Sequence, residues 1–186
     1  MVLFVKNMIS LPCKLHVKEE LRKMGLHVVN VELGVIEIRE NLTSQQRDEL
    51  QTRFRLVGLE LIEDRKSIII EKIKSVIIEM IHFSDDAPTM NYSDYISEKL
   101  KYDYTYLSNI FSEVKGMTIQ QFIILNKIER VKSLLLFDEL NLTEISYKLN
   151  YSSVAHLSNQ FKKVTGHAPS SYKKNHERQS QYLENL

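Results

Sequence analysis

The sequence predicts an α+β chain, in which a small domain with the element order β-α-β-β-α-β precedes an all-helical region. Within residues 1–65, stretches that alternate apolar and polar side chains flank two segments with helical periodicity. From residue 66 onward the apolar spacing is helical throughout, and one motif occurs twice, about 50 residues apart. We therefore expect two domains, residues 1–65 and residues 66–186.

The N-terminal elements are predicted from alternation and from the residues at helix ends. Gly25 and Gly58 follow the two helical segments, and Thr43 is placed to cap the second one. Two strands alternate around Gly34 as a hairpin, in which Val29, Val31 and Leu33 are expected to share one face. The order is that of a ferredoxin-like unit, an antiparallel sheet with both helices on one face. The predicted strands are residues 1–7, 27–33, 35–40 and 58–64, and the predicted helices are residues 13–24 and 43–58.

The loop after the first strand resembles the metal-binding loop of heavy-metal-associated domains. It runs from Met8 to Cys13, and it has Ser10 where the family pattern Met-x-Cys-x-x-Cys has its first cysteine. Soft cations such as Cu(I) need two thiolates, so the resemblance implies a degenerate unit without a metal or another cofactor. Cys13 and His16 are the candidate ligands, and the alternative for Cys13 is a small buried residue at the start of the helix. The role of the domain stays open between a ligand pocket, a dimer interface and a remnant.

Residues 66–83 continue as a helix with two apolar strips. Ile69, Ile73 and Met80 belong to one strip, and Ile70 and Ile77 belong to the other. A helix that is apolar on two sides must be covered on two sides. We expect one strip to pack on the helical domain and the other to meet the N-terminal domain or a second protomer, which allows a homodimer through residues 1–82.

Residues 143–174 have the capping and turn residues expected of a helix–turn–helix unit. Thr143 is placed to cap a short helix, a turn follows at Asn150 and Tyr151, and a second helix over residues 153–164 is closed by Gly166. The spacing predicts that the second helix points four side chains inward, namely Val154, Leu157, Phe161 and Val164. Its outer face is then small or polar and carries two lysines, as a helix in a DNA major groove requires. A solvated face is the alternative.

The same motif occurs upstream, in residues 96–116. Residues that repeat include the apolar positions and the closing glycine, and also the outward pair Ser108-Asn109, which recurs as Ser158-Asn159. A purely structural repeat would not need to keep an outward pair. Between the copies, Thr118 is placed to cap one long helix whose apolar positions include Phe122, Leu125, Val131 and Leu135.

Residues from about 67 to the end closely resemble the AraC-type DNA-binding domain of bacterial transcription regulators. The resemblance rests on Ile-x-x-x-Leu-x-Tyr from Ile145, on Phe161-Lys162-Lys163 and Gly166, and on the Pro-Ser-x-Tyr that begins at Pro169. It implies two helix–turn–helix units joined by a long helix, each of which inserts one helix into successive major grooves of DNA. The family often carries Arg on its recognition helices and at the position of Lys127, and this chain does not. The implied base contacts are Thr105, Ser108, Asn109, Ser112, Ala155, Ser158, Asn159 and Lys162, and the implied phosphate contacts are Lys101, Ser153, His156, Lys163, Ser170, Ser171 and Lys173.

Charge is distributed unevenly between the two copies. The whole chain carries a formal charge of +1. Residues 145–178 hold six Lys or Arg and one Glu, whereas residues 86–144 hold six cations and nine anions. We therefore expect the second copy to supply most of the salt-dependent affinity for DNA.

Motifs of catalysis are missing from the sequence, because it has no phosphate-binding Gly-rich loop and no His-Glu-x-x-His. The one cysteine excludes an intrachain disulfide, and no segment predicts a membrane span, so we expect a cytoplasmic protein that is not an enzyme. The sequence predicts a DNA-binding transcription regulator. Its expected partner is double-stranded DNA, and RNA polymerase is a second candidate partner. The alternatives are a metal-binding or metal-sensing regulator or chaperone acting through residues 1–65, and an interaction protein that does not bind DNA.

Overall fold

The computed structural model describes residues 1–83, 91–137 and 140–175 of the chain. It divides into two compact units. One unit consists of Met1–Val76 and Ile96–Val114, and the other of Ile77–Tyr95 and Lys115–Leu186. The predicted N-terminal domain therefore lies wholly within the first unit.

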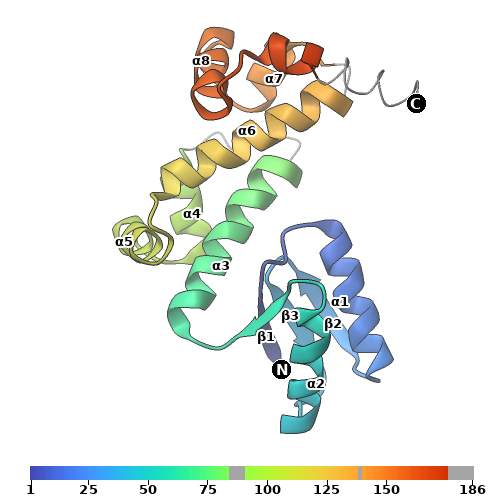
Figure 1. Cartoon of the computed structure of the whole chain (residues 1–186). Helices are drawn as coiled ribbons and strands as arrows, with labels where there is room; N and C mark the ends of the chain where they lie inside the picture. The colour runs from blue at the N-terminus through green and yellow to red at the C-terminus, as the bar shows by residue number, and fades with distance from the viewer. Residues whose placement is uncertain (84–90, 138–139, 176–186) are drawn as a thin grey trace, which may run out of the picture. The chain divides into compact units, whose positions relative to one another are not determined.

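The first unit is built on a four-stranded antiparallel sheet. Its strands follow the order β2-β3-β1-β4, so β2 and β4 are the edge strands. The predicted sequence of elements along the chain is confirmed (Figure 1). These elements are β1 (Val2–Lys6), α1 (Leu11–Lys23), β2 (Val28–Glu32), β3 (Val35–Ile38), α2 (Ser44–Arg55) and β4 (Glu60–Ile62).

One face of this sheet is covered by α1 and α2. Alternate residues of the central strands point toward the helices, so Leu3 and Val5 are buried together with Ile36 and Ile38. The helices contribute Val17, Leu21, Leu50 and Phe54 to the same core. Helix α2 begins with a capping box, in which the Thr43 hydroxyl accepts the Gln46 N–H and the Gln46 side chain accepts the Thr43 N–H. The predicted cap at Thr43 is thus confirmed.

The predicted face of the hairpin is wrong at Val29. A β-bulge between Val28 and Asn30 inserts one extra residue into β2, which breaks the alternation of side chains at that point. Val29 is consequently 55% exposed, while Val31 and Leu33 are buried and Val28 packs against the core.

Helix α3 (Arg65–Ile78) continues into the π-helical turn η1 (Glu79–Phe83). Both apolar strips are buried, as predicted. In the first unit, α3 is joined to the sheet by Glu71, whose carboxylate accepts the backbone N–H of Asn7, and by Lys72, whose ammonium lies 5.1 Å from the centre of the Phe4 ring. Gly34, at φ +75°, faces Ser75 so closely that a Cβ there would lie 3.0 Å from its Oγ. A side chain at position 34 would therefore be strained and crowded.

The remaining described elements are helices, as the spacing predicts. They are α4 (Tyr92–Leu100), α5 (Tyr104–Lys115), α6 (Ile119–Phe137), α7 (Leu142–Lys148) and α8 (Val154–Thr165), followed by helical residues from Pro169 to the end of the described chain. Thr118 caps α6, because its hydroxyl accepts the Gln121 N–H. The cap predicted at Thr143 is wrong: α7 starts one residue earlier, and Asn141 accepts the N–H groups of Thr143 and Glu144.

Val164, which the spacing placed on the inward stripe of α8, is instead accessible. Leu157 and Phe161 of α8 are fully buried, but Val164 is 37% exposed, and Leu125 of α6 is exposed as well. Val164 lies in the last turn of α8, just before the closing glycine. The inward stripe of α8 therefore rests on Leu157 and Phe161, with Val154 half-buried beside them.

Candidate nucleic-acid interface

The turn of each helix–turn–helix copy uses the same backbone conformation. Asn150, between α7 and α8, has φ +56°, and Lys101, between α4 and α5, has φ +58°. Few residues other than glycine adopt this left-handed region, so its occurrence at repeat-equivalent positions is a specific feature. We call α4 with α5 the first copy and α7 with α8 the second copy.

Helix capping is also equivalent in the two copies. Asn91 and Asn141 each accept backbone N–H groups at the start of the first helix. Asp103 accepts the N–H of Tyr106 at the start of α5, and Ser153 accepts the N–H of His156 at the start of α8. Gly116 and Gly166 follow the second helices at φ +66° and +80°. The duplication inferred from the sequence therefore extends to the backbone and its caps.

The outer face of α8 is open to solvent over its whole length. Ala155, His156 and Asn159 are exposed, and so are Lys162 and Lys163, whereas the Ser158 hydroxyl is half-buried. Leu157 and Phe161 lie beneath this face, and Phe161 contacts the Tyr172 ring edge-on at 5.5 Å between centroids. A small residue, an amide and two ammonium groups on one rigid face can make base-edge and phosphate contacts.

The outer face of α5 is open too, but it carries no cluster of cations. Thr105 and Asn109 are exposed, and Ser108 and Ser112 are half-buried. The acidic residue of this helix, Glu113, forms an ion pair with Lys66 at 2.6 Å. Both helices thus present the predicted polar residues, and α8 adds the positive charge.

The predicted phosphate contacts fall at several places on the helix–turn–helix units. Lys101, Ser170 and Ser171 are exposed, and Lys173 is half-buried. The Ser153 oxygen is engaged as the cap of α8. The His156 ring lies 2.9 Å from the Ser152 hydroxyl through Nδ1 and meets the Tyr151 ring edge-on, which holds the imidazole beside the start of α8.

Lys127 of α6 occupies a buried position that sequence analysis missed. Its side chain is 7% exposed, and its ammonium lies 5.0 Å from the Tyr92 ring centre and 4.5 Å from that of Tyr151. Burial lowers the pKa of Lys127 to about 8. The two ring faces offset part of the cost of burying the cation.

Tyr151 connects this lysine to α8. Its hydroxyl donates to the Gln160 side chain at 2.7 Å, and burial raises the pKa of the hydroxyl above its ordinary value. The equivalent Tyr102 stacks on Tyr106 of α5 at 5.6 Å. The sequence repeat places Tyr102 and Tyr151 at equivalent positions. This equivalence was the signal that could have indicated a contact of each tyrosine with the second helix of its copy. In each copy, then, an aromatic residue of the turn braces the first part of the second helix.

The candidate metal ligands lie at the start of α1. Cys13 is half-buried, and its sulfur lies 3.1 Å from the Ser10 hydroxyl. His16 is half-buried one turn further on. Within the described residues, no group of three or more His, Cys, Asp or Glu side chains could hold a metal ion. Nothing in the structure supports the metal-sensing alternative.

A family model described as a helix-turn-helix domain matches residues 96–175, which include most of α4 and all of α5 to α8. This region is a helix–turn–helix domain. The C-terminal domain of AraT, a response regulator from Geobacillus stearothermophilus, matches with a TM-score of 0.50 and 26% identity, covering 60% of this chain and 88% of that one. The DNA-binding domain of AdpA, solved in complex with a target DNA, shares the fold at a TM-score of 0.50 and 13% identity, covering 60% and 94% of the two chains.

The chain is also similar to curated HTH-type transcriptional regulators. The HTH-type transcriptional regulator YtdP of Bacillus subtilis is 24% identical over 157 residues, which is 80% of this chain and 20% of YtdP. The chain thus spans about a fifth of the length of that relative. In the described parts of the chain, no helix has both the length and the apolar character needed to cross a membrane.

Proposed function

We propose that this protein is a transcription regulator that binds double-stranded DNA sequence-specifically, with α8 and α5 entering two successive major-groove segments. The observation that carries the proposal is the open polar face of both helices, each mounted on the same turn, caps and closing glycine. A fold of this type has been solved with target DNA in AdpA, which supports the same use here. The name of YtdP, a transcriptional regulator, supports the regulatory role.

The side chains of α8 suit direct contact with bases. Asn159 can pair with the N6 and N7 positions of adenine, and Ser158 can donate to or accept from a base edge. Ala155 allows the helix backbone to approach the groove closely. Lys162, which lies on the same face, can reach a base or the adjoining backbone, and Lys163 is placed for a phosphate.

The side chains of α5 provide a second, uncharged set of contacts. Thr105, Ser108, Asn109 and Ser112 can all hydrogen-bond to bases, while Lys101 stands in the turn before the helix. Ser170, Ser171 and Lys173, in the helical residues after α8, complete the proposed phosphate contacts. In this arrangement both copies contribute to sequence preference, and the second copy contributes most of the counterion release.

We further propose that residues 1–65 form a ferredoxin-like domain joined to the DNA-binding region 66–186. The β-α-β-β-α-β order, the antiparallel strand order β2-β3-β1-β4 and the placement of α1 and α2 on one face support this assignment. Contact with RNA polymerase and a homodimer through residues 1–82 remain predictions.

Selection of double-stranded oligonucleotides from a random pool tests the proposal. We expect the full chain to enrich a motif with two conserved elements about 10 base pairs apart, one for each recognition helix. A single element would overturn the two-segment part of the proposal. Binding that is equally tight to selected and random DNA would overturn sequence-specific recognition altogether.

A further inference from the structure

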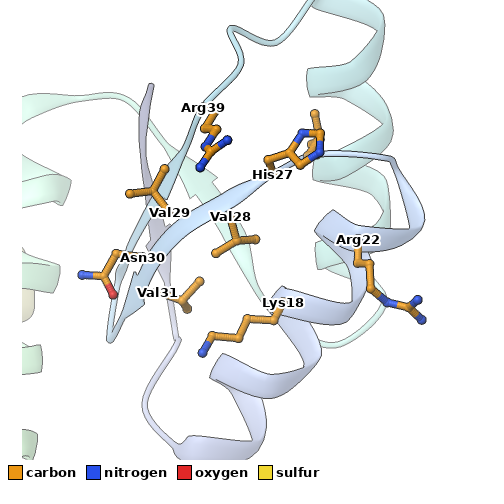
Figure 2. Close-up of a pocket in the computed structure, with 9 residues that line it drawn as sticks. Lys18, Arg22, His27, Val28, Val29, Asn30, Val31 and Arg39 are labelled. Atoms are coloured by element: carbon orange, nitrogen blue, oxygen red, sulfur yellow. The ribbon is translucent and has the colours of Figure 1, made fainter.

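A groove follows the outer edge of the sheet in the first unit. It has a volume of about 560 Å³ and runs along edge strand β2 (Figure 2). Five consecutive residues, from His27 to Val31, form its floor, and α1 and the residue after β3 supply its sides. At a rise of about 3.4 Å per residue, that floor is about 13 Å long. The groove therefore has the length of a short extended peptide.

The charged residues that line this groove are all basic. Lys18 and Arg22 come from α1, and Arg39 follows β3. None of the three forms an ion pair or a side-chain hydrogen bond with any residue that the structure describes. Neighbouring lysines of the same helix are paired, Lys14 with Glu32 and Lys23 with Glu20. Within α1, the two cations that are left without a carboxylate, Lys18 and Arg22, are the ones that line the groove.

Figure 2 shows how these cations flank β2. Lys18 extends from α1 on the side of Val31, Arg39 points toward β2 from the opposite side of the view, and Arg22 lies further along α1 and points away. Because Ile38 faces α1 and α2, strand alternation places Arg39 on the other face of the sheet. Positive charge therefore stands on both faces of the edge strand. His27, at one end, is already held by Glu40, whose carboxylate accepts its backbone N–H.

The backbone of β2 is available for pairing on its outer side. As an edge strand, β2 pairs with β3 alone among the described strands. An added strand would send alternate side chains to the two faces of the sheet. One set would meet Lys18 and Arg22 beside α1, and the other would meet Arg39 and the exposed Val29.

We propose that this groove binds an extended acidic peptide segment of a partner protein, which adds to β2 as a fifth strand and sets its carboxylates against Lys18, Arg22 and Arg39. A second copy of this chain fits poorly, because two β2 edges would bring the cations of both copies together, while the one acid of β2, Glu32, is paired with Lys14. A small anion would use neither the length of the groove nor the cations on both faces. The positive charge also protects this strand edge from non-specific pairing. It repels basic strands and the same edge of a second copy, whereas it attracts acidic strands.

Fluorescence anisotropy on the full chain tests this, with the labelled six-residue peptide Glu-Glu-Val-Val-Glu-Glu as the probe, because adjacent glutamates in a strand face opposite sides of the sheet. The controls are the same peptide with lysine in place of glutamate and the acidic peptide interrupted by proline. The groove variant is Lys18→Glu/Arg39→Glu. The matched control is Arg55→Glu/Arg65→Glu, which makes the same charge change at two exposed cations outside the groove. Should the groove variant misfold, the neutral Lys18→Gln/Arg39→Gln replaces it.

We expect the acidic peptide to bind and both control peptides to fail. The groove variant should weaken binding about tenfold or more, and the matched control by less than about threefold. Hydrogen exchange at the amides of residues 28–32 should slow when the acidic peptide is present. Equal losses in the two double variants, or unchanged exchange in β2, would overturn the proposal. So would displacement of the peptide by free glutamate or inorganic phosphate at the peptide's own concentration, or sedimentation that shows self-association through β2.

Discussion

The two helix–turn–helix copies share a backbone and differ in their surfaces. Both have a left-handed residue in the turn, an asparagine cap before the first helix and a glycine after the second. Both also brace the second helix with an aromatic residue of the turn. Yet α8 carries Lys162 and Lys163 and no acid, whereas α5 carries Glu113 and Lys115. The two copies thus share their internal framework and differ in the charge of the second helix.

This difference indicates separate constraints on the inside and the outside of the repeat. A buried leucine or a cap is fixed by packing and hydrogen bonding, which are the same in every copy. A surface charge is fixed by its partner, so its loss from α5 implies weaker phosphate anchoring by that copy. We therefore expect the two copies to respond alike to changes in the interior and differently to changes of surface charge.

The largest effect is expected in the interior, and it should be alike in the two copies. Leu157 and its equivalent Leu107 are both fully buried. Leu157→Ala and Leu107→Ala should each lower the free energy of unfolding by about 2–5 kcal/mol, because each leaves a cavity. Urea unfolding followed by circular dichroism measures this. The controls are Val164→Ala and Val114→Ala at exposed positions, 37% and 46%; losses there as large as at the leucines would contradict the inward stripe.

The second effect concerns Lys127, which contacts Tyr92 of the first copy and Tyr151 of the second. Its pKa is lowered to about 8 from the ordinary value of 10.5. Between these two pH values the unfolded chain binds a proton at this site that the folded chain does not, so folding stability should rise with pH across that window.

Lys127→Met isolates this contribution, because the variant cannot titrate there. The wild-type free energy of unfolding should rise more than that of the variant between pH 8 and 10.5, by up to about 3 kcal/mol. Urea unfolding at several pH values gives the two curves. Parallel curves would show that Lys127 keeps an ordinary pKa in the folded protein.

Sequence patterns predicted the helices and strands well, but they did not predict the local irregularities at helix ends and in the sheet. Periodicity found every strand and helix of the N-terminal sheet domain and the two recognition helices, because burial of one face imposes it. It failed at Val29, where a bulge shifts the alternation, since a bulge leaves no mark in hydrophobicity alone. It also placed the cap of α7 at Thr143, because Asn141 and Thr143 are both good capping residues and the choice depends on where the chain enters the helix.

Contacts between side chains of distant segments were also missing from the sequence-based prediction. Lys127 carries a charge and sits in a helix, so its burial between two tyrosines could not be inferred without knowing which helices pack together. The groove along β2 has the same origin, because it joins residues of α1, β2 and the end of β3. The outward positions of α5 and α8, in contrast, followed from helical spacing, and the structure places them all at least partly in solvent.

The third effect compares the two outward asparagines. Asn159→Ala should reduce affinity for the selected DNA by about 1–3 kcal/mol and relax the preference at one base pair, since Asn can make two hydrogen bonds to adenine. Asn109→Ala should act at a different base pair, with a smaller loss because its copy is less firmly anchored. Binding to selected and single-base-changed oligonucleotides measures both. Gln120→Ala, at an exposed residue of α6, is the control, and equal losses on selected and random DNA would contradict base recognition by either asparagine.

The smallest effect separates the copies by charge alone. Lys163→Gln should weaken binding to selected and random DNA alike and reduce the slope of log affinity against log salt by about 1, as expected when one phosphate contact is lost. Lys101→Gln removes the equivalent kind of contact from the first copy, where Asp103 stands two residues away in the sequence and repels a phosphate at this position. Its slope should change by less. Titrations at several salt concentrations give both slopes, and a larger change for Lys101→Gln would place the electrostatic anchor in the first copy, against the charge distribution.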